Sequence, residues 1–239
     1  MLDIFATDPE AARARQEREE KIEAARGNRP TFNFQLRSGK RVGRQPVSLK
    51  TWRITTPHKE VLDALKELFG GTVEEAPNGD YALDTDREYI EVILDPRKIE
   101  AKLIQWADGL PIHECDGQTS LLKEDEGQPC GCPPLLADKK ERAKQRRGPK
   151  PNIVIPFLLP QDVDLGTGKY TATAWSFAED LPFVMKRMEK ISGDVLCRLR
   201  LEHVEYTTQA GEKREFTKPV LEVVGSYNDA IADDPEPDF

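Results

Sequence analysis

Cysteine and histidine side chains, which are scarce in this chain, gather in one short segment. His113, Cys115, Cys130 and Cys132 are three of the four cysteines and one of the three histidines. Thiolate and imidazole groups are the ligands of structural zinc sites, which hold four of them in a tetrahedron. His113 and Cys115 would face the same side of an extended strand, and Gly131 permits a tight turn between Cys130 and Cys132. These four residues are therefore the predicted ligands of a structural zinc ion.

The spacing of this segment leaves unliganded thiols and a redox pair open as alternatives, because neither pair has the common Cys-x-x-Cys form. His113 is the weakest of the four ligands, since a surface histidine is nearly as good an interpretation. Cys197 falls in an expected strand, where a buried cysteine usually behaves as a small apolar residue, and it is the reserve ligand. Residues 120–127 are polar and are not expected to hold themselves in place, so a metal ion would supply the cross-link.

Catalysis by this segment finds little support in the residue pattern. A catalytic zinc needs an open coordination position and a nearby acid–base group, and Glu114 and Asp116 are adjacent carboxylates in a chain rich in them. The sequence contains no glycine-rich phosphate loop, no nucleophile elbow and no paired-histidine metalloprotease motif. The residues favour a protein that is not an enzyme, with a zinc hydrolase as the less favoured alternative.

Composition argues against several other classes of protein. The chain has 239 residues, a formal net charge of -8 and a pI of about 5.2, whereas proteins whose main task is to bind duplex phosphates are usually basic. No apolar run approaches the roughly 20 residues that span a bilayer, and the first residues lack the pattern of a secretory signal. Clustered cysteines without such a signal favour a reducing, cytoplasmic compartment, where thiolates hold metal more often than they form disulfides.

Hydrophobic periodicity predicts an α+β protein, a mixed fold of two subdomains with mainly antiparallel sheets, a few helices and a small Cys/His zinc-binding loop. Helices are expected over residues 9–26, 58–69 and 177–191. Strands are expected over residues 51–56, 81–85, 89–94, 102–107, 152–160, 169–175, 195–206 and 216–225, the last two as a hairpin. The aromatic residues Trp52, Trp106, Trp175 and Phe157 fall in strand-like segments and are expected in the core or in an interface.

The predicted domain organisation has five parts. They are an N-terminal helix or arm at 1–29, an α/β subdomain at 30–136 with the zinc loop at 112–133, a basic linker at 137–151, a second α/β subdomain at 152–228 with the C-terminal hairpin, and a disordered acidic tail at 229–239. Thr7 or Asp8 should cap the first helix, and Gly27 and Asn28 should end it. Because its apolar face is thin, this helix is either solvated or ordered by a partner.

The basic linker also has two interpretations. It holds seven lysine and arginine residues between positions 139 and 150. Such a run is either a solvated connector or a non-specific, salt-sensitive contact to DNA that a partner already holds.

Several motifs occur in an order that resembles a known family. They are Trp52-Arg-Ile-Thr-Thr-Pro, Leu68-Phe-Gly-Gly, the strand near Trp106, Cys115-Asp-Gly, Pro129-Cys-Gly-Cys-Pro and the late hairpin. Over most of its length the chain resembles the recombination directionality factors that act with large serine integrases in temperate phages of Streptomyces and other actinobacteria. The two cysteine motifs are its most specific part. Similar proteins carry a further cysteine just after the basic segment, where this chain has Gly148-Pro-Lys-Pro-Asn, so His113 as the fourth ligand departs from their pattern.

The resemblance implies an accessory protein with no catalytic activity, in the cytoplasm of the bacterial host cell. It would bind the phage serine integrase near its zinc domain and coiled coil, on attachment-site DNA, with little or no DNA binding of its own and no membrane contact. It would redirect the coiled coil and so switch the integrase from integration (attP × attB) to prophage excision (attL × attR). The first helix, the hairpin edge and the basic segment are candidate contacts. The alternative is a zinc-containing DNA-binding recombination mediator.

Overall fold

The computed structural model describes residues 8–27, 31–43, 45–75, 79–207 and 211–232. Contacts divide the chain into two compact units. Unit 1 comprises residues 1–31 and 102–150, and unit 2 comprises residues 32–101 and 151–239. The units interleave along the sequence, so the predicted subdomain at 30–136 has residues in both of them.

Unit 2 contains two β-sheets. One runs in the order β3-β4-β2-β1-β9-β8 and the other in the order β11-β10-β5. The strands are β1 (Phe34–Val42), β2 (Gln45–Thr56), β3 (Thr72–Glu75), β4 (Tyr81–Asp84), β5 (Tyr89–Leu94), β8 (Lys150–Phe157), β9 (Gly168–Ala172), β10 (Val195–Thr207) and β11 (Lys213–Ser226). Neighbouring strands pair antiparallel, except that β1 and β9 pair parallel. The prediction of an α+β fold with mainly antiparallel sheets is confirmed.

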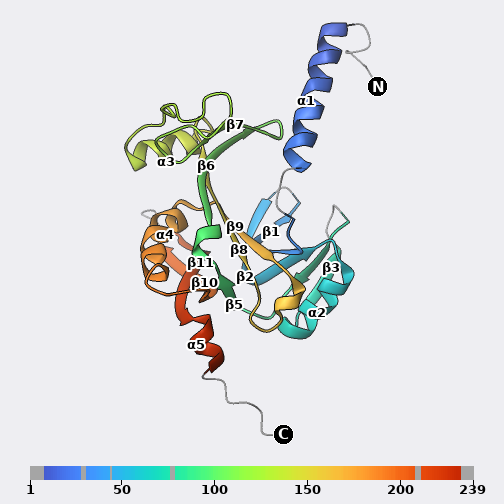
Figure 1. Ribbon diagram of the computed structural model, residues 1–239, viewed down its shortest axis with the longest axis vertical. Coiled ribbons are helices and arrows are strands. Elements are labelled where there is room, and N and C mark those ends of the chain that lie inside the picture. Colours follow the sequence, from blue (N-terminus) through green and yellow to red (C-terminus); the bar gives the residue numbers. More distant parts are fainter. Residues whose placement is uncertain (1–7, 28–30, 44, 76–78, 208–210, 233–239) are drawn as a thin grey trace. The chain divides into compact units, whose positions relative to one another are not determined.

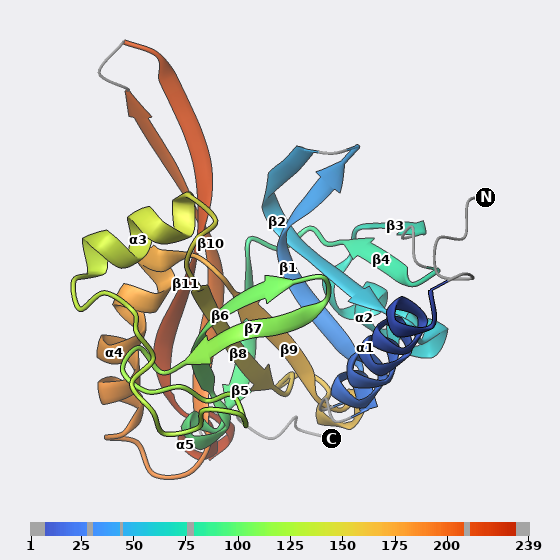
Figure 2. The ribbon, with the colours of Figure 1, turned by 90° about the horizontal axis from the view of Figure 1, so that it is seen from above.

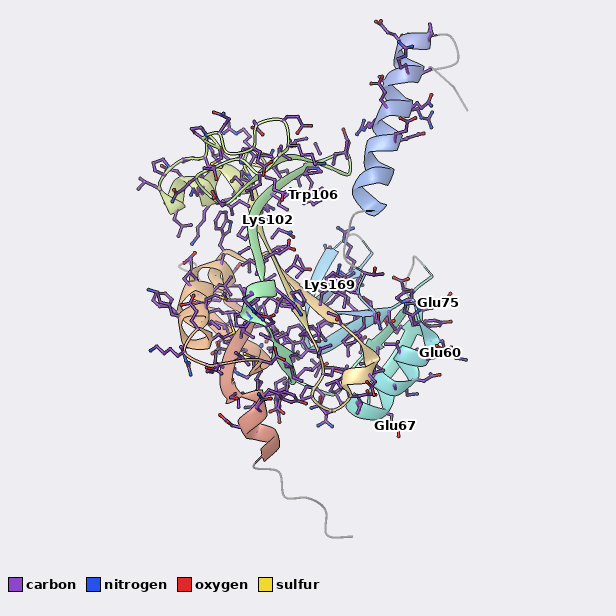
Figure 3. The ribbon with its side chains drawn as sticks, viewed as in Figure 1. Glu60, Glu67, Glu75, Lys102, Trp106 and Lys169 are labelled. Atoms are coloured by element: carbon purple, nitrogen blue, oxygen red, sulfur yellow. The ribbon has the colours of Figure 1, made fainter. Side chains whose placement is uncertain are left out.

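Helix α2 (Lys59–Phe69) covers β2 and β4 of the first sheet (Figure 1). Its buried residues Leu62, Leu65 and Phe69 recur at helical spacing, which is the pattern that predicted this helix. Glu60 and Glu67 project from the opposite side (Figure 3). The helix ends where Gly70 adopts a positive φ of 67°, as the glycine pair suggested.

The core of unit 2 joins its two sheets through Trp52. The indole Nε1 of Trp52 donates a hydrogen bond to the carbonyl oxygen of Leu199 at 3.1 Å, from β2 to β10. The Trp52 ring also packs edge-on against Tyr170, with ring centroids 5.2 Å apart. Trp52 and Phe157 are buried, as predicted, whereas the Trp106 side chain is 49% exposed. Because its indole N–H is buried and hydrogen-bonded, Trp52 links the two sheets through both its apolar ring and its polar group.

The hairpin β10–β11 continues past this core as a two-stranded arm (Figure 2). Its register runs without interruption from Cys197 opposite Val223 to Thr207 opposite Lys213. The base of β10 is largely buried, whereas residues 205–207 are exposed. The predicted hairpin is confirmed, although part of its loop, residues 208–210, lies outside the described residues.

Four further helical segments belong to unit 2, and one prediction for its C-terminal end was wrong. They are α4 (Trp175–Met188), α5 (Tyr227–Ala232) and two 3-10 turns, Pro96–Lys98 and Val163–Leu165. Residues 229–232 were predicted to be disordered, and this was wrong, because they continue a helical turn that begins at Tyr227. Residues 233–239 of the predicted tail lie outside the described part of the chain.

Unit 1 contains α1 (Pro9–Gly27), most of strand β6 (Glu100–Ala107), strand β7 (Leu110–Cys115) and α3 (Leu136–Lys144). The Asp8 carboxylate caps α1 by accepting hydrogen bonds from the backbone N–H groups of Glu10 at 3.0 Å and Ala11 at 3.1 Å. The predicted cap at Asp8 and end at Gly27 are confirmed. The alternative cap Thr7 and the stop residue Asn28 lie outside the described residues.

The predicted basic linker at 137–151 is wrong, because most of it forms helix α3. Alanine, lysine, glutamate and arginine, which make up most of this segment, are good helix formers. Ala143 on the inner side of α3 is only 1% exposed. The charge of the segment hid a helix whose buried face is very narrow.

Candidate metal centre

The hairpin β6–β7 presents the first two members of the cysteine and histidine cluster. Its strands are joined by Asp108 and Gly109, which have positive φ values of 52° and 85° and form the two-residue turn typical of tight hairpins. His113 and Cys115 lie two residues apart on β7, so their side chains leave the same face of the hairpin. The Cys115 side chain is fully buried.

Asp116 shapes the loop that follows Cys115. Its carboxylate accepts hydrogen bonds from the backbone N–H groups of Gln118 at 2.8 Å and Thr119 at 2.7 Å, and from the Thr119 hydroxyl at 2.8 Å. These bonds hold the pKa of the Asp116 carboxyl below its usual value. Aspartate commonly closes a turn in this way, so Asp116 has a local structural role.

Backbone hydrogen bonds return the chain to Cys115. The N–H of Cys130 donates to the carbonyl of Gln118 at 2.8 Å. Ser120 donates its hydroxyl to Asp125 at 2.7 Å, and its carbonyl accepts the N–H of Gly127 at 3.0 Å. The expectation that residues 120–127 cannot hold themselves in place is therefore wrong, because polar side chains and backbone groups bond within the loop.

The four side chains meet in one cluster. The ligand atoms of His113, Cys115, Cys130 and Cys132 all lie within 4.8 Å of one another. Cys115 Sγ is 3.8 Å from Cys132 Sγ, and Cys132 Sγ is 3.4 Å from His113 Nε2. In a tetrahedral zinc site with ordinary bond lengths, two sulfurs lie about 3.8 Å apart and a sulfur and a nitrogen about 3.6 Å. The donor set and its spacing fit a metal ion, and the sulfur separation is far longer than a disulfide bond.

Burial controls the ionisation of the three thiols. Burial raises the pKa of Cys115 to about 12. Burial, followed by the hydrogen bond to Cys130, also raises the pKa of Cys132. Burial opposes ionisation of Cys130 as well, but hydrogen bonds from the Cys132 backbone and thiol outweigh it and lower the pKa of Cys130. Because metals bind thiolates, a metal ion entering this cluster would release protons.

Helix α3 closes the other side of the cluster. The Lys139 ammonium donates a hydrogen bond to the carbonyl of Gly117 at 3.2 Å, and its charge favours the thiolates of Cys130 and Cys132. A small cavity of about 100 Å³ adjoins the cluster. Its lining includes Lys139, Arg142, Arg147, and the Gly148–Pro149 segment, where the resemblance would place a further cysteine. Lys139 was not singled out as a site residue, because only the folded chain brings it to the cysteines.

All four predicted ligands come together, whereas other candidates do not join them. Cys197 is buried in unit 2, where its sulfur contacts Met188 Sδ at 3.9 Å and burial raises its pKa to about 12. Its prediction as the reserve ligand is wrong, and it behaves as the apolar residue that the sequence favoured. Glu114 pairs with Lys102 at 3.0 Å. Neither it nor Asp116 belongs to the cluster.

Comparison with protein families decides the affiliation of the chain. A model of the Gp3-like family, described as recombination directionality factor-like, matches residues 10–224. The chain belongs to this family. The match covers both units and the whole cysteine and histidine cluster, and it assigns the protein a regulatory, recombination-related phage function. No solved structure matches the chain.

Among the described residues, no helix combines the length and apolar character needed to cross a membrane.

Proposed function

We propose that this protein binds a phage serine integrase on attachment-site DNA and switches it from integration (attP × attB) to prophage excision (attL × attR). The observation that carries the proposal is the match to the recombination directionality factor-like family over residues 10–224. The protein itself needs no catalytic group for this task, because the integrase performs the strand exchange. We place its work in the cytoplasm of the bacterial host cell, where the integrase meets DNA.

The cysteine and histidine cluster would hold zinc in a structural role. His113, Cys115, Cys130 and Cys132 would occupy all four tetrahedral positions, which leaves no open position for substrate or catalytic water. Bound zinc supplies a cross-link between β7 and the loop that carries Cys130 and Cys132. This closed donor set supports a scaffold rather than the zinc hydrolase considered above.

The switch in direction must come from unequal affinity for two states of the integrase. A ligand shifts a conformational equilibrium only by the difference between its affinities for the two states. A change from 1:99 to 99:1 requires about 5.5 kcal/mol of preference. We infer that this protein docks near the integrase zinc domain and fixes the coiled coil in the direction that favours synapsis of attL with attR. Contacts repeated over four integrase protomers would divide that preference into small increments.

The arm formed by β10 and β11 is the contact that the structure supports best. Tyr206 and Phe216 lie on one face of the arm, 48% and 44% exposed, with ring centroids 6.0 Å apart. Exposed aromatic residues are enriched at the energetic centres of protein interfaces. A two-stranded ribbon that extends past its core is marginally stable alone, so a partner would also order it.

A recombination assay with purified integrase tests the proposal. With wild-type protein, attL × attR recombination should begin and attP × attB recombination should fall. Substitution Y206A/F216A should reduce both effects, whereas the matched control F183A, which removes an aromatic ring on α4 that is 71% exposed, should not. Unchanged direction with wild-type protein would reject the proposal.

A gel-shift experiment separates this function from the alternative of a DNA-binding recombination mediator. The integrase partner predicts a supershift only when integrase is present on the DNA. A shift of attachment-site DNA by this protein alone at physiological salt would favour the mediator.

A further inference from the structure

Helix α3 and the turn after it form a basic surface in an acidic protein. Residues 136–150 contain seven basic and two acidic residues, an excess of five positive charges in a chain whose net charge is -8. We call this segment the α3 surface. Most of it is solvent-exposed, although Ala143 and Gly148 are buried. Its charges are therefore displayed by a folded element and not by a loose connector.

Two cations of the α3 surface lack the carboxylate partners that three arginines of unit 2 have. In unit 2, Arg53, Arg198 and Arg200 each pair with a carboxylate within 3 Å. Arg142 and Lys144, by contrast, form no ion pair within the described part of the chain, although both are exposed. Neighbouring positive charges without counter-charges repel one another, and an external anion would relieve that repulsion.

The α3 surface lies beside the cysteine and histidine cluster within unit 1. Lys139 joins α3 to Gly117 in the loop after Cys115, and α3 begins a few residues after Cys132. The backbone carbonyl of Arg146 accepts a hydrogen bond from Gln105 on β6 at 3.4 Å. A helix whose backbone is already ordered loses less backbone entropy on binding than a flexible segment does.

We propose that the α3 surface binds the phosphate backbone of duplex DNA that the integrase already holds; this inference rests on the proposed function. Duplex DNA carries one negative charge per about 1.7 Å of its axis, a denser and more regular array than a protein surface offers. Arginine guanidinium groups suit bidentate contact with phosphate oxygens. The contact is independent of base sequence, because phosphates carry no sequence information.

The net charge of the protein explains why such a contact acts only within the complex. A chain with a net charge of -8 is repelled by free DNA. Docking on the integrase would make the contact intramolecular, at an effective concentration on the order of millimolar. A few phosphate contacts, too weak to bind free DNA at physiological salt, then add affinity for the DNA-bound integrase alone.

A pair of matched double variants tests the proposal. R142Q/K144Q removes two cations from the last turn of α3, and K186Q/R187Q removes two from the last turn of α4. Both variants lose the same charge at the same position of a helix, so effects on the helix dipole and on net charge are common to them. Equal metal content and equal melting temperature would show that each variant folds as the wild type does.

The measurement is the affinity for integrase with and without attachment-site DNA. Each phosphate contact adds about 0.9 to the slope of log affinity against log salt. Between about 50 and 200 mM salt, wild-type protein should therefore lose about tenfold more affinity for DNA-bound integrase than R142Q/K144Q does. The α4 control should follow wild type, and all three proteins should bind DNA-free integrase equally.

Two outcomes would overturn the proposal. An equal loss by R142Q/K144Q on DNA-free integrase would assign the α3 surface to an acidic protein partner. If R142Q/K144Q binds both DNA-free and DNA-bound integrase with wild-type affinity, the α3 surface is a solvent-exposed face that takes no part in binding.

A second experiment separates failure of the phosphate contact from failure of the proposed function. It measures binding to a plain duplex without integrase at low salt, about 20 mM, where screening is weak. If integrase is not bound at all, weaker duplex binding by R142Q/K144Q than by the α4 control would still support the phosphate contact. Equal binding by the two variants would reject it.

Discussion

Different forces stabilise the inside of each of the two units. Almost all buried apolar side chains of the described residues belong to unit 2, and unit 1 has only Ile104, Cys115 and Ala143. Unit 2 thus has the core expected of a folded domain. Unit 1 relies on hydrogen bonds within its loops and on the cluster of three cysteines and one histidine. A metal ion bound at this cluster should therefore stabilise unit 1 and be dispensable for unit 2.

The largest expected effect comes from removing one ligand. Cys115→Ser, or treatment with a strong chelator, should abolish metal binding, and structural zinc contributes on the order of 10 kcal/mol or more. Peptide-level hydrogen exchange should then rise across residues 102–150, with no change over β10 and β2. The control His58→Ala alters an exposed histidine of unit 2 and should retain full metal content. Equal loss of protection in unit 2 would show that the metal ion also stabilises unit 2.

Trp52→Ala should weaken unit 2 and leave metal binding in unit 1 unchanged. It removes a buried ring and its hydrogen bond to Leu199, and such substitutions cost about 3–5 kcal/mol. Denaturant unfolding of unit 2 should shift to lower concentration, while the metal content stays at one equivalent under native conditions. Loss of metal from folded Trp52→Ala protein would contradict the independence of the two units.

Acid should weaken unit 2 through a network of four charged residues. Asp84 accepts hydrogen bonds from Lys40 at 2.8 Å and Arg53 at 2.6 Å, and Glu74 joins the same two cations. Burial opposes ionisation of Asp84, but these hydrogen bonds outweigh it and lower its pKa. A lowered pKa contributes stability above the unfolded value, which is lost as pH falls through the folded value.

Unfolding experiments between pH 6 and pH 2 check this expectation. Wild-type unit 2 should lose stability below about pH 4, where carboxylates begin to protonate. Asp84→Asn should be less stable at pH 6 and should change less on acidification. A slope as steep as that of the wild type would show that Asp84 is not a source of the acid sensitivity.

The smallest effect should follow loss of the cap on α1. Asp8→Ala removes the acceptor for the N–H groups of Glu10 and Ala11, and a lost cap costs about 1 kcal/mol. Hydrogen exchange at the first turn of α1 should accelerate, with metal content and unit 2 stability unchanged. A wider effect would mean that α1 supports more of unit 1 than its own first turn.

Local patterns predicted the elements that depend on neighbouring residues. Helix α2 follows from apolar residues at helical spacing, and the β10–β11 hairpin follows from two long strand-like runs. Strand β1 was not predicted, because only Phe34 and Leu36 are buried and its remaining residues are polar or exposed. Its backbone pairs with β2 and β9, and such pairing leaves little trace in side-chain periodicity.

The four ligand candidates were identifiable from their chemistry, because scarce thiols and an imidazole have few other uses in a charged chain. The sequence did not show that Lys139 joins them, nor that Cys197 stays apart. Those facts depend on which surfaces meet after folding. The hydrogen bond from Cys130 to Gln118 and the packing of α3 bring distant residues to one point.

The amino-acid sequence by itself determined which side chains can bind a metal and which short segments are helical or extended, since both properties belong to single residues and their near neighbours. Only the tertiary structure decided that residues 102–150 join residues 1–31 in one compact unit, and that most of the basic segment is a helix beside the cysteines. The physical reason is that burial and strand pairing act between segments far apart in the chain, where periodicity carries no information.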